Sequence, residues 1–227
     1  MTTDGFYELS AIVDTLLGPD GCPWDREQTI QSLRSDLLEE CYEAADAIDK
    51  NNMSGLLEEL GDVLLCVVLM IKKAELSNAF TMHDVFAAIC AKMVNRHSHV
   101  FGSDKAATAQ EALDVWKRNK ANEKAQKGLH GVMADIPAAL PALMRAEKIL
   151  VVANGDDGVL QEHDILPKII NDLQSLQKTP QTSHSSKALQ EKIGSILLNF
   201  VAMSKNLGIS SELSLTKAIE AFINRFA

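Results

Sequence analysis

Aromatic residues and long apolar runs are scarce in this sequence. Phe, Trp and Tyr together make up 5% of its 227 residues, and the longest apolar run is Val63–Ile71. A membrane-spanning helix needs about 20 apolar residues, so we expect no membrane span and no membrane partner. The first ten residues have no basic segment followed by an apolar one, so we expect no secretory signal and a cytoplasmic location.

Closely spaced cysteines and a phosphate-binding glycine loop are also missing. The four cysteines, Cys22, Cys41, Cys66 and Cys90, form no CxxC pair. Such spacing predicts reduced, buried thiols rather than disulfides or a zinc site. The sequence contains no GxxxxGK[ST] motif, which excludes a P-loop for binding phosphates.

Basic residues are fewer than acidic ones: the chain has 22 Lys and Arg and 31 Asp and Glu, which gives a net charge of −9. An acidic chain is repelled by the phosphate backbone of nucleic acids, so we expect no nucleic-acid partner. It can still bind a polyphosphate where metal ions lie between the two.

What the sequence does contain is helical periodicity, together with abundant Leu, Ala, Ile, Glu and Lys, which indicates an all-α protein. Thr81 and Asp84 are spaced as a capping box, and the apolar centre of the segment 54–76 predicts a buried helix. The polar stretch 177–187 is predicted to be mobile. The expected helices are 6–17, 27–49, 54–76, 81–96, 108–127, 146–153, 165–176, 189–207 and 213–226.

Two pairs of acidic residues stand out on consecutive helices. Glu40 and Glu43 are three residues apart, as are Glu59 and Asp62, so each pair shares one helix face. The break 51–55 between the helices lets them fold back on each other and bring the four carboxylates together. Clustered oxygen ligands without a thiolate or an imidazole suit a hard cation, most simply Mg²⁺.

The end of the chain repeats its beginning in a weaker form. GDVLLCVVLM (61–70) is similar to GSILLNFVAM (194–203), and this alignment places Lys192 opposite Glu59 and Ser195 opposite Asp62. By the same comparison Glu39, Glu40 and Glu43 fall approximately opposite Asn171, Asp172 and Ser175. We therefore predict a catalytic domain over 1–127, a connector over 128–145 and a degenerate second helical domain over 146–227.

Six motifs occur in a fixed order: CPWDREQT, EECYE, EELGD, NRHSHVFG, VWKRNK and DIPAALPALMRAEKI. Together they resemble MazG, a family of all-α nucleoside triphosphate pyrophosphohydrolases. The resemblance is close over roughly residues 6–150, and beyond them it is that of a degraded second MazG domain. It implies an all-α fold of tandem MazG-like helical bundles with a degenerate second copy.

The resemblance also implies an activity, namely Mg²⁺-dependent hydrolysis of nucleoside triphosphates to monophosphate and pyrophosphate by a homodimer. Lys92 and Arg96 would contact the triphosphate, and Trp116 and Lys120 would close over the nucleotide. Glu39 would act as a base or outer-shell group. The implied metal ligands, which together with Glu39 form the implied catalytic set, are Glu40, Glu43, Glu59 and Asp62.

Two other functional classes compete with this interpretation. The first is a MazG-like protein that binds nucleotides, or regulates, without hydrolysing them. The second is a carboxylate-bridged di-iron bundle, which uses Glu-x-x-His pairs, and no Glu in this chain has a His three residues later. The acidic pairs could also be solvated helix faces, although Glu59 and Asp62 adjoin the most apolar helix of the chain.

Overall fold

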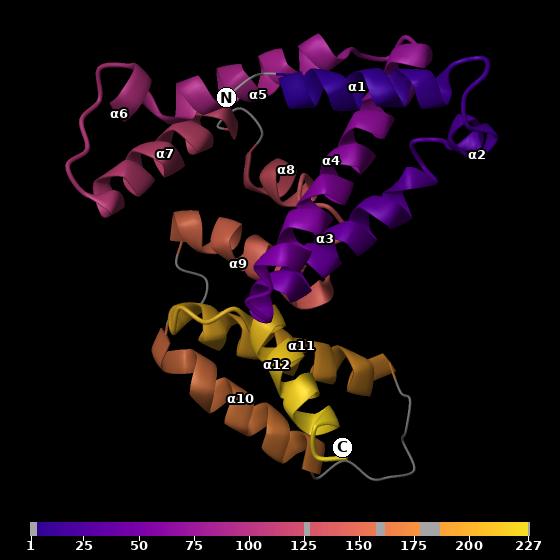
Figure 1. Cartoon of the computed structure of the whole chain (residues 1–227). Helices are drawn as coiled ribbons and strands as arrows, with labels where there is room; N and C mark the ends of the chain where they lie inside the picture. Colours follow the sequence, from indigo (N-terminus) through magenta and orange to yellow (C-terminus); the bar gives the residue numbers. More distant parts are fainter. Residues whose placement is uncertain (1–3, 125–127, 158–161, 178–186, 227) are drawn as a thin grey trace. The chain divides into compact units, whose positions relative to one another are not determined.

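The computed structural model describes residues 4–124, 128–157, 162–177 and 187–226, and within these ranges every regular element is a helix (Figure 1). The all-α prediction is therefore confirmed. The predicted mobile stretch 177–187 lies almost wholly outside the described residues. The helices are α1 (Asp4–Leu17), α2 (Pro23–Glu27), α3 (Leu33–Asp49), α4 (Met53–Leu76), α5 (Met82–Arg96), α6 (Ser98–Phe101), α7 (Ala109–Lys124), α8 (Gly128–Ala134), α9 (Ala142–Asp157), α10 (Glu162–Gln177), α11 (Lys187–Asn206) and α12 (Ser211–Ile223).

The chain divides into two compact units, Met1–Asn119 and Lys120–Ala227. The boundary falls inside α7, whereas the sequence predicted it after residue 127. The predicted connector 128–145 contains the helix α8 and the first residues of α9. The predicted division into domains is otherwise left as a prediction.

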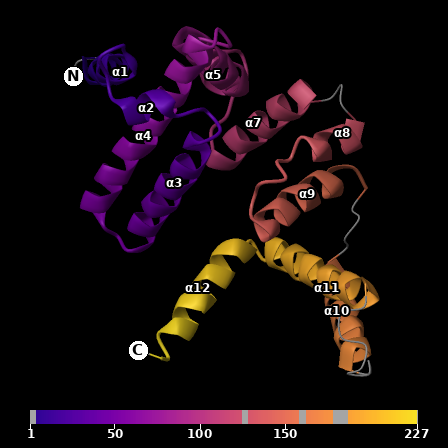
Figure 2. The ribbon, with the colours of Figure 1, turned by 90° about the vertical axis from the view of Figure 1, so that its right-hand side faces the viewer.

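The first unit is organised by the antiparallel pair of α3 and α4, which pack along their length (Figure 2). The turn between them uses Asn51 in the left-handed region, at φ 53°, a conformation that Asn tolerates better than most residues. Asn52 then caps α4, because its side-chain oxygen accepts a hydrogen bond from the Gly55 amide at 3.1 Å. This short turn sets which residues of the two helices face each other.

The core of the first unit joins α1, α3 and α4. Val13 and Val68 are fully buried, and Leu33 and Leu69 complete the cluster. Cys66 is buried close by, whereas Cys41 and Cys90 are exposed and Cys22 is half-buried. All four cysteines are free; the prediction of burial holds only for Cys66, and the prediction of reduced thiols stays a prediction.

Two details of the first unit differ from the sequence-based expectation. The predicted helix 27–49 is broken, because Thr29 and Ser32 exchange side-chain-to-backbone hydrogen bonds of 2.9 and 3.0 Å that compete with helix formation. The helix α4 is buried on one face only. Its other face exposes an apolar stripe of Leu57, Leu60, Leu64 and Val67, whose spacing of three and four residues makes it continuous.

The start of α5 agrees with its prediction. The Thr81 hydroxyl accepts from the Asp84 amide, and the Asp84 carboxylate accepts from the Thr81 amide, so the capping box is confirmed. Hydrogen bonds from Thr81 hold the pKa of Asp84 below its ordinary value.

The second unit is built around α9, α10 and α11, with α10 and α11 as its most extensively packed pair. Ile169 and Val201 are almost fully buried in its core, together with Leu150, Ile165 and Ala202. The helix α12 begins at a Ser210 cap, and the Glu212 carboxylate accepts a hydrogen bond from the Met144 amide in the first turn of α9 at 3.3 Å. Each unit thus has a core of its own.

Candidate metal centre

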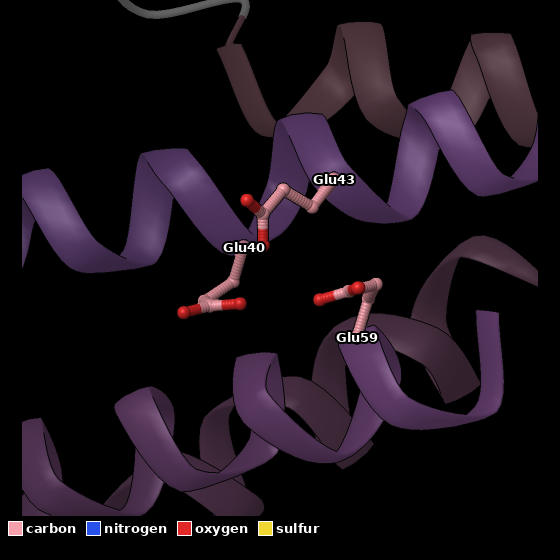
Figure 3. Close-up of side chains that lie close together, drawn as sticks. All are labelled: Glu40, Glu43 and Glu59. Carbon is pink, nitrogen blue, oxygen red and sulfur yellow. The ribbon is translucent and has the colours of Figure 1, made fainter. Parts of the chain in front are cut away.

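Three carboxylates converge between α3 and α4. Glu40 and Glu43 reach across from α3, and Glu59 reaches back from the second turn of α4 (Figure 3). One oxygen of each lies within 4.8 Å of the others, and this is the only such group of possible metal ligands among the residues that the structure describes. Glu40 and Glu59 are half-buried, and Glu43 is exposed.

The charges of this cluster oppose one another. Partial burial raises the pKa of Glu40, and the charges of Asp62 and Glu43 raise it further. Partial burial likewise raises the pKa of Glu59, with added repulsion from Glu43 and Glu40. Protonation or a bound cation would relieve this repulsion. The arrangement is therefore suited to holding positive charge.

The other predicted carboxylates flank the cluster. Asp62 lies one turn after Glu59, and Glu39 immediately precedes Glu40. Neither belongs to the group of three converging oxygens, but the charges of both contribute to the raised pKa of Glu40. Asp62 is half-buried and Glu39 is exposed. The structure thus brings three of the five predicted carboxylates together and places two beside them.

The predicted cationic and aromatic residues lie on α5 and α7, apart from the carboxylates in the sequence, and the structure brings Arg96 and Trp116 together. The guanidinium carbon of Arg96 lies 5.3 Å from the centre of the Trp116 ring, a cation–π contact. Lys92 is exposed one turn earlier on α5, and Lys120 follows Trp116 by one turn on α7. The two views place α5 at the C-terminal end of α4, whereas Glu59 lies near the start of α4 (Figures 1 and 2).

Comparison with known proteins identifies the family. The MazG nucleotide pyrophosphohydrolase domain matches residues 28–101. The chain is 37% identical over 221 residues to a nucleoside triphosphate pyrophosphohydrolase of Escherichia coli (strain K12), covering 96% of this chain and 84% of that protein. It is also 37% identical over 223 residues to the nucleoside triphosphate pyrophosphohydrolase/pyrophosphatase MazG of Thermotoga maritima, covering 97% and 84% respectively. The chain belongs to the MazG family.

The matched MazG domain covers α3, α4 and α5, which carry all five predicted carboxylates as well as Lys92 and Arg96. Trp116 and Lys120 lie on α7, beyond the matched residues. A crystal structure of a mazG-related protein from Thermotoga maritima is 28% identical to this MazG-family chain, with a TM-score of 0.45, over 50% of this chain and 97% of that one.

Sequence reasoning missed a polar network beside Arg96 and Trp116. The Asn119 amide donates to the Ser98 hydroxyl at 2.7 Å, and Asp104 accepts from Ser98 at 2.5 Å and from Arg118 at 2.8 Å. The only signal in the sequence was the presence of these residues within or next to the NRHSHVFG and VWKRNK motifs of MazG. Nothing in their spacing showed that they meet.

Replacing Glu59 by Gln is expected to stabilise the metal-free MazG-family protein at neutral pH. The folded-state pKa of Glu59 is raised above its ordinary value of 4.5, so the charged form opposes folding, and this cost is absent below that value. As pH rises through the raised pKa, the wild type loses stability that the Gln variant keeps. Thermal unfolding in a chelating buffer at several pH values would measure the difference. An equal gain in melting temperature at acid and neutral pH would contradict this explanation.

Proposed function

We propose that the chain hydrolyses nucleoside triphosphates to nucleoside monophosphate and pyrophosphate, with Mg²⁺ held by the carboxylates of its first unit. The observation that carries the proposal is the convergence of Glu40, Glu43 and Glu59 between α3 and α4. The names of its relatives support the same reaction, since proteins that match nearly the whole chain are nucleoside triphosphate pyrophosphohydrolases.

The donor set fits Mg²⁺ in its chemistry. All the donors are carboxylate oxygens, which hard cations prefer, and no sulfur or imidazole belongs to the group. Glu40, Glu43 and Glu59 would hold the ion, with Asp62 as the fourth ligand from the following turn of α4. Partial burial raises the pKa values of Glu40 and Glu59, and the charges of the neighbouring carboxylates raise them further, so negative charge is unfavourable at this place. Mg²⁺ would balance it.

The reaction cleaves the anhydride bond between the α- and β-phosphates, with water attacking the α-phosphorus and pyrophosphate leaving. A bound Mg²⁺ would supply positive charge at the phosphates and lower the pKa of its water. Glu39, exposed beside the cluster, is the residue that we propose to accept the proton of the attacking water, directly or from the outer shell. The remaining carboxylates would fix the geometry of the site.

The substrate would be held by the group on α5 and α7. Lys92 and Arg96 lie four residues apart on one face of α5, so both can donate to phosphate oxygens, Arg96 as a planar fork. Trp116 offers an aromatic face to the base, and Lys120 lies one turn further on the same helix. This assignment of Lys92, Arg96, Trp116 and Lys120 remains a proposal.

We further propose that the protein acts as a homodimer. The exposed stripe of Leu57, Leu60, Leu64 and Val67 covers the face of α4 that α3 does not. A second copy of α4 is a suitable partner, because a continuous apolar stripe on a helix is normally covered by another helix.

The second unit is proposed to be catalytically silent. Lys192 on α11 donates a hydrogen bond to Ser175 on α10, and the internal repeat aligns these two residues with Glu59 and Glu43. The aligned positions thus face each other in both helix pairs, which supports the tandem arrangement. With Lys192 and Ser195 where the first unit has Glu59 and Asp62, the second pair lacks the charge to hold Mg²⁺.

The test is pyrophosphate release from a panel of ribo- and deoxyribonucleoside triphosphates, with Mg²⁺ and with chelator. Monophosphate and pyrophosphate in equal amounts, only with Mg²⁺, are expected. Release of inorganic phosphate alone would contradict the proposed bond cleavage. Binding of nucleotide and Mg²⁺ without any turnover would support a silent binding protein instead.

No helix in the described part of the chain is long and apolar enough to cross a membrane. The predicted cytoplasmic location and the predicted lack of a nucleic-acid partner stay predictions.

A further inference from the structure

The side-chain amide of Asn119 joins α7 to the end of α5. Its nitrogen donates to the Asn95 carbonyl at 3.2 Å and to the Ser98 hydroxyl at 2.7 Å, and it approaches the Arg96 carbonyl at 3.5 Å. These carbonyls belong to the last residues of α5, whose acceptors have no partner within the helix. Asn119 therefore caps α5 from a different helix.

Two further hydrogen bonds close this contact into a loop. Ser98 donates to the Asp104 carboxylate, and Arg118, the neighbour of Asn119 on α7, donates to the same carboxylate. The hydrogen bond from Ser98, followed by the charge of Arg118, holds the pKa of Asp104 below its ordinary value. A single exposed ion pair would add little rigidity. A closed network of four side chains restricts the movement of α7 against α5 far more.

The network lies beside the contact between Arg96 and Trp116. Arg96 is the last residue of α5, and Trp116 precedes Asn119 by three residues, so Trp116 and Asn119 share a face of α7. The guanidinium lies 5.3 Å from the ring centre. The spacing of these two groups depends on how α5 and α7 are held together, and Asn119 is the side chain that bonds directly to the α5 end.

We propose that Asn119 is a positioning residue for nucleotide binding, which fixes the guanidinium of Arg96 and the indole of Trp116 at one spacing for the phosphate and the base of the substrate. This inference rests on the proposed function. Asn119 itself touches neither the reacting atoms nor the substrate. Its effect is on affinity, because a preformed pair binds without the cost of ordering two helices.

The test uses a Trp24→Phe background. The chain has two tryptophans, and Trp24 is 71% exposed on α2, so its replacement leaves Trp116 as the only tryptophan, which can be excited selectively over the two tyrosines. In this background Asn119→Ala removes the donor, and Asn119→Asp keeps the shape but replaces the donor by an acceptor. Gln110→Ala is the matched control, since Gln110 on α7 donates only to Asp114 of the same helix among the hydrogen bonds described for it, at 2.9 Å.

Both Asn119 variants are expected to raise KM about tenfold and to change kcat less than about twofold, since misplacing binding groups weakens substrate positioning. The nucleotide concentration that half-saturates the Trp116 fluorescence change should rise by the same factor. Without nucleotide, acrylamide should quench Trp116 more strongly than in the background protein. Gln110→Ala should leave all three values unchanged.

The outcomes separate this inference from the proposed function. If the background protein neither hydrolyses nor binds nucleoside triphosphates, the proposed function fails. If it does both, and the Asn119 variants change only the melting temperature, Asn119 is a helix cap without a role in binding and the inference is overturned. An unchanged KM with a reduced kcat would overturn it as well. All variants are compared at a temperature at which circular dichroism shows each to be folded.

Discussion

Glu59→Gln is expected to lower Mg²⁺-dependent pyrophosphate release by on the order of 100-fold or more, because losing an outer-shell partner of a metal alone costs 10–100-fold. Gln keeps the size of the side chain and one oxygen but removes the negative charge. Glu59 is the residue that α4 contributes to the three converging oxygens. In the Gln variant only the two α3 carboxylates of this group would remain charged. Pyrophosphate release at saturating Mg²⁺ and nucleotide measures the effect.

The neighbouring Glu58→Gln is the matched control for this substitution. Glu58 is exposed and does not belong to the converging group, yet its replacement changes the net charge by the same amount. We expect its activity to stay within about twofold of the wild type, because Glu58 offers no oxygen to the converging group and its charge, although it adds to the raised pKa of Glu59, acts through solvent that contains salt. Equal losses in both variants would show that net charge, rather than a ligand, had been removed, and would contradict the assignment of Glu59.

Ile169→Ala is expected to destabilise the protein by about 2–5 kcal/mol, the usual cost of truncating a buried Ile. Ile169 is 2% exposed at the centre of the core of the second unit, where it packs with Val201 and Leu150. The second unit has no predicted ligand set to stabilise it, so its stability depends on this core. Urea unfolding followed by circular dichroism measures the loss.

Ile170→Ala, one residue away, makes the same chemical change on the outer face of α10. Ile170 is 45% exposed, so its truncation is expected to cost less than about 1 kcal/mol, as is usual for surface positions. If Ile170→Ala proved as destabilising as Ile169→Ala, the exposed face of α10 would have to be covered in solution. That result would add α10 to the surfaces proposed to associate.

The sequence predicted the helices well because each long helix has a clear local signal. The turn 51–55 and the Thr81–Asp84 capping box are marked by residue types whose effect is local, and both are found as expected. The break before Leu33 was missed, because Thr29 and Ser32 bond across a turn within a segment whose helical periodicity continues on both sides. The partial exposure of α4 was missed for a different reason, since apolar composition does not tell whether the chain itself or a partner covers a face.

The candidate site was likewise predictable where local spacing decides the structure, and not where separate helices meet. Spacing placed Glu40 and Glu43 on one face and Glu59 on the next helix, and the short turn made their convergence a matter of geometry. The contact between Arg96 and Trp116 joins residues from separate helices through the intervening segment 97–108, and periodicity carries no information about such a pair. Asn119 and Asp104 were missed for this reason.

The repulsion between α3 and α4 also affects the order in which the chain assembles. The two helices are close in sequence, and contacts of that kind usually form early in folding. Here the early contact brings three carboxylates together between α3 and α4. Their repulsion opposes the contact until counter-ions gather between the two helices. The turn at Asn51 and Asn52 therefore has to hold the hairpin closed while the apolar core behind it forms. We therefore expect higher ionic strength or divalent cations to speed renaturation, because they would screen the same glutamates that would serve catalysis.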